Sequence, residues 1–83
     1  MAKHEKTLRA VFTEPTLGTI KWLDIEALFK HHGAEISEGK GSRVRILFKN
    51  TPHTFHRPHP RKETVKGAVE TVRRIFREAG IVP

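Results

Sequence analysis

The sequence predicts one α+β domain spanning residues 1–83, with helices packed on one face of a three-stranded antiparallel sheet, in the order α-α-β-β-β-α. Apolar residues recur at helical spacing near both ends of the chain, whereas in the middle they alternate with polar residues. Glycine and proline residues separate these stretches. A chain of 83 residues is long enough to fold alone, but its core is thin.

Two of the expected helices lie at the ends of the chain. The first covers residues 3–13 and carries Leu8, Val11 and Phe12 on one face. The last covers residues 66–79, where apolar residues form a helical stripe and Gly80 follows as the C-cap. The outward face of this last helix is expected to carry Arg73, Arg74 and Arg77.

A further helix is expected over residues 21–32. Its apolar stripe consists of Trp22, Ile25, Leu28 and Phe29. Acidic residues lie in its first turn and basic residues in its last, the order that the helix dipole favours. Gly33 supplies the C-terminal stop.

The sheet is expected over residues 34–57. Its strands are predicted at residues 34–38, 43–49 and 53–57, with turns at 39–42 and 49–52. Strict alternation in the second strand puts Val44, Ile46 and Phe48 on one face. If Phe55 points to the core, the opposite face carries Arg43, Arg45, Thr54 and His56. That face is therefore predicted to be free, polar and basic.

The composition restricts the class of protein. The formal net charge of +7 favours a nucleic acid as the partner over a membrane or a cationic substrate. The absence of Cys excludes disulfides and thiolate metal sites. No apolar run approaches the roughly 20 residues of a membrane span, and no signal-peptide core is visible. The expectation is a soluble cytoplasmic protein that does not act at a membrane.

The most informative stretch of the chain is residues 39–62. It contains seven Lys or Arg, three His and no acidic residue, so its field attracts a polyanion such as RNA. A Gly-x-Gly-Ser turn at its start is typical of a hairpin, and its basic neighbours also favour phosphate contact. The residues predicted to bind RNA are Lys40, Ser42, Arg43, Arg45, Arg57, Arg61 and Lys62.

Histidine is the side chain best suited to proton transfer near neutral pH. His56 is the first catalytic candidate because it is expected on the basic face. The alternative interpretation is that His56 is an exposed strand residue without a role. His59, held between Pro58 and Pro60, is the second candidate; its alternative is a residue that only orders the loop. His53 is interpreted as a solvated bystander, and His4, His31 and His32 are expected to be uninvolved.

No metal or other cofactor is predicted. The His56-x-x-His59 spacing suggests a metal pair, but Pro58 intervenes and no Cys or matching acid cluster is present. Two other residues have two interpretations each. Trp22 either packs in the core or stacks on a base, with packing preferred, and Glu63 either orients a His or Arg or is an acid at the start of the last helix.

The order helix–β–β–β–helix matches that of double-stranded RNA-binding domains and of the small HicA toxins. The residues favour the second group. The blocks KTLRAVF, KWLDIEALFKHHGAEISEGKGSR, FHRPHPRKE and VRRIFREAGI resemble successive blocks of a HicA-family mRNA interferase, over residues 6–81. The Gly-Ser turn and the Pro-His-Pro-x-x-Glu segment are the most specific parts of this resemblance.

The resemblance implies a metal-independent endoribonuclease that cuts mRNA and is silenced by a HicB-like antitoxin. The chain departs from the family pattern at one position: typical members carry a catalytic His after the Gly-Ser of the turn, where this chain has Arg43. Arginine, with a pKa above about 12, cannot act as a general base at neutral pH, but it can bind phosphate or stabilise a charged transition state. Two alternatives to the nuclease therefore stay open: a non-catalytic RNA-binding module of the same fold, and a protein that only docks an acidic antitoxin.

Overall fold

A computed structural model describes residues 2–83 and contains three helices and three strands. The helices are α1 (Lys3–Val11), α2 (Trp22–His31) and α3 (Lys66–Glu78). The strands are β1 (Glu35–Glu38), β2 (Arg43–Phe48) and β3 (Thr51–His56), and they follow α2 in the chain. The predicted α+β class and element order are confirmed, with each helix one or two residues shorter than expected.

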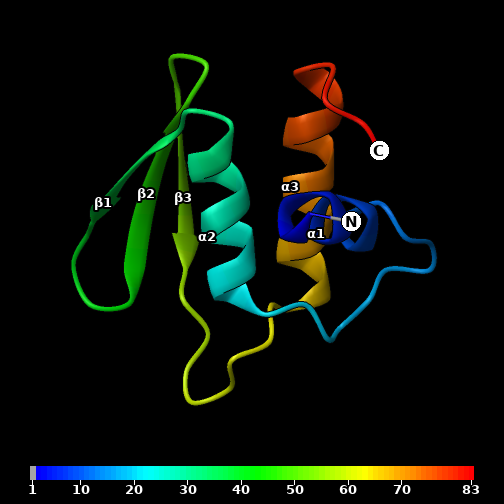
Figure 1. The fold of residues 1–83 in the computed structure, drawn as a ribbon. Coiled ribbons are helices and arrows are strands. Elements are labelled where there is room, and N and C mark those ends of the chain that lie inside the picture. The colour runs from blue at the N-terminus through cyan, green and yellow to red at the C-terminus, as the bar shows by residue number, and fades with distance from the viewer. Residues whose placement is uncertain (1) are drawn as a thin grey trace.

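The sheet is antiparallel, with β2 between β1 and β3. Burial alternates strictly along β2: Val44, Ile46 and Phe48 are buried, whereas the residues between them are exposed. Figure 1 shows the sheet on one side of the molecule and all three helices on the other. The helices thus cover one face and leave the other open, as the alternation predicts.

The turn between β2 and β3 is shorter than predicted. It consists of Lys49 and Asn50, which have positive φ angles of 52° and 64°, so β3 begins at Thr51. Pro52, assigned to the turn from the sequence, lies within β3 opposite Leu47. An edge strand tolerates this proline because the residue's nitrogen can face away from the neighbouring strand. The two-residue turn sets which residues of β2 and β3 face each other.

The core lies between the helices and the covered face of the sheet. Phe29 of α2 is fully buried at its centre, with ring centroids 5.5 Å from Phe48 and 4.8 Å from Phe76. Trp22 is 3% exposed, which confirms the preferred interpretation that it packs in the core. Gly33 ends α2 at a φ of +89°, a conformation that glycine adopts without steric cost.

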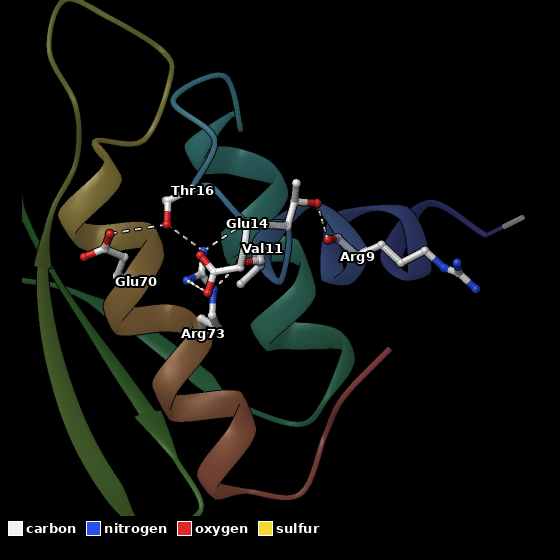
Figure 2. Close-up of polar contacts among 7 residues, drawn as sticks. Arg9, Val11, Glu14, Thr16, Glu70 and Arg73 are labelled. Carbon is white, nitrogen blue, oxygen red and sulfur yellow. Dashed lines mark hydrogen bonds and ion pairs between the residues drawn. The ribbon is translucent and has the colours of Figure 1, made fainter.

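The prediction that Arg73 lies on the outward face of α3 is wrong, because the residue is only 6% exposed. Its guanidinium donates to the carbonyl oxygens of Val11 at 2.8 Å and Thr13 at 3.2 Å. It also donates to the Thr16 hydroxyl at 2.8 Å and the Glu14 carboxylate at 3.1 Å (Figure 2). The end of α1 and the following connector cross α3 here, so Arg73 joins α3 to the N-terminal segment.

None of the helices within residues 2–83 has the length and apolar character needed to cross a membrane.

Candidate nucleic-acid interface

The open face of the sheet, here called the outer face, brings Arg43 and His56 together. Arg43 lies directly opposite His56 in the β2–β3 register, and Arg45 lies opposite Thr54. The Arg57 amide donates to the Ser42 carbonyl at 2.8 Å, one position beyond the Arg43–His56 pair. That pair therefore falls at a non-hydrogen-bonded site, where Cα atoms are about 4.5 Å apart and side chains are closest. Both residues are exposed. The predicted sharing of one face by these residues is confirmed.

The turn between β1 and β2 adds a third cation to the outer face. Lys40 lines one surface pocket with Arg43, Arg45 and Thr54. The turn is closed by backbone bonds from the Gly39 amide to the Arg43 carbonyl, at 2.9 Å, and from the Arg43 amide to the Lys40 carbonyl, at 3.2 Å. Gly41 has a φ of +63°, so the Gly-x-Gly-Ser sequence meets the conformational need of a hairpin. The same turn places three cationic side chains around one depression, an arrangement suited to a phosphate.

His59 lies in the loop between β3 and α3, and the loop is tied to the start of α2. The Trp22 amide donates to the Lys62 carbonyl at 3.0 Å, and the Thr64 amide donates to the Ile20 carbonyl at 2.7 Å. Between these bonds, Lys21 and Glu63 form an antiparallel bridge. His56 and His59 line the same pocket, with Pro58 and Pro60 between and beside them. The two histidines predicted from the sequence are thus brought to one site.

Arg57 differs from the other predicted RNA contacts because its guanidinium forms ion pairs with two carboxylates. Its Nε donates to Oε2 of Glu26 at 2.8 Å, and Nη1 donates to Glu38. The Glu26 side chain is only 9% exposed and also accepts a bond from the Trp22 indole. These bonds raise the pKa of Arg57, and the guanidinium in turn lowers the pKa of Glu38.

The remaining basic side chains of the loop face solvent. The Arg61 side chain is 74% exposed, and its Nε lies 3.9 Å from Oε1 of Glu63. Glu63 therefore pairs with an arginine, one of its two proposed roles; Val65, not an acid, is the N-cap of α3. Lys62 and Ser42 are also exposed. The loop can thus offer Arg61 and Lys62 to a ligand at little desolvation cost.

The other histidines lie on the helix side of the sheet. His53 is half-buried beside Phe48 and Ile75, where burial and then Arg74 lower its pKa and Glu78 opposes them. It is therefore less solvated than predicted. His4 stacks on His31 with ring centroids 4.3 Å apart, and His31 contacts His32 edge to face. Within residues 2–83 no three or more His, Asp or Glu side chains are arranged to hold a metal ion.

Sequence comparison adds an independent finding. A family model described as the HicA toxin of bacterial toxin–antitoxin systems matches residues 22–81, well over half of the chain. The match covers α2, the sheet, the loop with His59 and α3, and leaves α1 outside. The chain is therefore a toxin of the toxin–antitoxin class. Within that class it belongs to the HicA family. No curated protein and no solved structure gives a significant match.

Proposed function

We propose that this HicA-family toxin is a metal-independent endoribonuclease that cuts mRNA in the cytoplasm. The observation that carries the proposal is the cross-strand pairing of Arg43 and His56 on an exposed basic face. A proton carrier and a fixed positive charge lie side by side there, and the second histidine, His59, lines the same pocket as His56. Cleavage of RNA without a metal is accelerated by a base for the 2'-hydroxyl, an acid for the leaving 5'-oxygen and a cation near the phosphate.

In the proposed reaction the ribose 2'-oxygen attacks the adjacent phosphorus. One histidine takes the proton from the 2'-hydroxyl as the new O–P bond forms. The bond from phosphorus to the 5'-oxygen breaks, and the other histidine, in its protonated form, gives a proton to that oxygen. The products are a 2',3'-cyclic phosphate and a free 5'-hydroxyl, so atoms and charges balance. His56 and His59 fill these two roles in either order.

Arg43 supports this reaction as a cation. Because arginine keeps its proton, it cannot replace a general base, but it can stabilise the extra negative charge of the pentacoordinate phosphorus. Its place next to His56 puts this charge beside the proposed reaction centre. We propose that Lys40, Ser42, Arg45, Arg61 and Lys62 hold the flanking phosphates, and that Arg57 supports the loop rather than the RNA.

The partner that we propose is a HicB-like antitoxin, since membership of a toxin–antitoxin system implies an antitoxin. A second candidate function is RNA binding without cleavage. It is favoured by Arg43, which stands where the family resemblance places a histidine.

The test is cleavage of a labelled single-stranded RNA by the purified protein in EDTA, with the termini mapped. His56→Ala and His59→Ala should each cut about 10²–10⁴-fold more slowly while keeping their fold and most of their RNA affinity. His31→Ala, on the helix side of the sheet, is the matched control and should cut as fast as wild type. Normal cleavage by either histidine variant would remove the catalytic assignment of that histidine, and RNA binding without any wild-type cleavage would favour the second candidate.

A further inference from the structure

A second pocket lies on the other side of the loop that carries His59. It is lined by Lys21, Trp22 and Leu23 from the start of α2, and by loop residues that include Pro58, Pro60 and Arg61. Pro58, Pro60 and Arg61 also line the pocket of His56 and His59. The two pockets therefore share one wall, formed by the loop itself. We call this second depression the Leu23 pocket.

The Leu23 pocket combines apolar walls with positive charge. Leu23 is 72% exposed although it is a large apolar side chain, and it faces solvent next to two proline rings. Lys21, Arg61 and Lys62 are exposed at the same pocket, and no acidic residue lines it. Within residues 2–83, neither Lys21 nor Lys62 forms an ion pair, so their charges are available to an anionic ligand.

The walls of the pocket are held in place. Trp22, at its base, is 3% exposed and bonded to Glu26, which also holds Arg57 at the start of the loop. The Trp22 amide and the Lys62 carbonyl, 3.0 Å apart, join the two sides of the pocket through the backbone. A ligand would therefore meet a surface that is ordered before binding, which lowers the entropic cost of association.

We propose that the Leu23 pocket is a nucleobase subsite that binds one unstacked base of single-stranded RNA. The inference rests on the proposed function, because it places this base next to the phosphate at which His56 and His59 would act as proton carriers. The apolar side chains of Leu23 and the prolines contact the face of the base, while Lys21, Arg61 and Lys62 neutralise the phosphates on either side of it.

The charge of the pocket distinguishes this ligand from an apolar peptide. A purely hydrophobic partner would leave several cations desolvated and unpaired, which is costly. A nucleotide supplies an apolar face and an anion within the same unit, which matches the pocket in both respects. Double-stranded RNA does not offer a free base face, so the subsite selects for single strands.

The test compares two fluorescent probes of equal length that both lack the attacking hydroxyl: a 2'-O-methyl oligoribonucleotide and a chain of abasic 2'-O-methyl ribose phosphates. Binding of wild type, Leu23→Ser and Val82→Ser is measured by anisotropy. Val82 is the matched control because it is 58% exposed and follows α3, whose 13 residues span about 20 Å away from the loop (Figure 1). Both changes lie on exposed side chains, and circular dichroism checks that each variant is folded.

Leu23→Ser should bind the intact oligonucleotide about 3- to 10-fold more weakly than wild type, the loss expected for reduced contact with one base. On the abasic probe the two proteins should bind equally, and Val82→Ser should match wild type on both probes. Equal binding of Leu23→Ser and wild type to the intact probe would overturn the subsite, as would a loss of the same size on the abasic probe.

The outcomes separate this inference from the proposed nuclease. If wild type cuts RNA but Leu23→Ser binds as tightly as wild type, only the subsite fails. If the predicted difference in binding is found but wild type never cuts, the subsite stands and the nuclease proposal fails. If wild type binds neither probe, both fail.

Discussion

Arg57 and Arg61 lie four residues apart in one loop, and we predict that replacing each by Ala affects a different property. Arg57 forms an ion pair with the carboxylate of Glu26, whose side chain is 9% exposed, whereas the Arg61 side chain is 74% exposed. Arg57→Ala should therefore lower the free energy of unfolding, and Arg61→Ala should instead weaken RNA binding.

The loss in the free energy of unfolding depends on whether the substitution leaves a buried charge without its partner. Removing one partner of a fully buried ion pair costs about 3–5 kcal/mol, because the other charge stays buried and unpaired. The Arg57 side chain is 31% exposed, so water can reach part of the site and the loss should be lower. We expect about 2–3 kcal/mol, which corresponds to a fall in Tm of roughly 10–20 °C for a domain of this size. Arg61→Ala should stay within about 0.5 kcal/mol of wild type.

The assay is urea denaturation at pH 7 for each variant, together with RNA affinity measured on the folded protein. Glu26→Gln in the Arg57→Ala background supplies a further check, because it removes the unpaired buried charge. That double variant should recover part of the lost stability. Equal stability of Arg57→Ala and wild type would refute the argument, and so would a loss in Arg61→Ala as large as that in Arg57→Ala.

Three further predictions concern stability and RNA binding. Arg73→Met should lower the free energy of unfolding by about 3–4 kcal/mol in urea denaturation, since it leaves the buried carbonyl of Val11 and the partly buried carbonyl of Thr13 without a donor. Arg74→Met, with a side chain 58% exposed, should cost under about 0.5 kcal/mol. Burial, followed by the charges of His31, His4 and Lys49, lowers the pKa of His32, so the unfolded chain takes up this proton first. Stability should fall as the pH drops from 7.5 to 5.5, through the ordinary histidine pKa of about 6.5, and less steeply in His32→Gln; an identical slope in both proteins would exclude His32 as the cause. RNA affinity should fall with added salt. Each phosphate contact on a single strand contributes about 0.7 to the slope of log affinity against log salt concentration, so the double variant Arg43→Ala with Arg45→Ala should reduce that slope by about 1.4. An unchanged slope would exclude these two contacts.

Local sequence patterns determined the element order and the faces of the elements. Alternation along β2 predicted that Val44 and Ile46 would be buried and Arg43 and Arg45 exposed, and the structure confirms this. Helical spacing likewise predicted the buried stripe of α2, including Trp22. These features depend on the period of the backbone, which is 2 in a strand and 3.6 in a helix, so a short window of sequence contains the information.

Only the tertiary structure decided which distant residues meet. Arg57 pairs with Glu26 and Glu38, which lie 31 and 19 positions earlier, and no local pattern relates them. Arg73 was predicted on the outward face of α3, but it donates to the carbonyls of Val11 and Thr13, which come from the other end of the chain. The β2–β3 turn was expected to include Pro52, yet it consists of Lys49 and Asn50 alone. Ion pairs, burial and strand register depend on chain segments that come together only on folding, which is why they cannot be read from a short window of sequence.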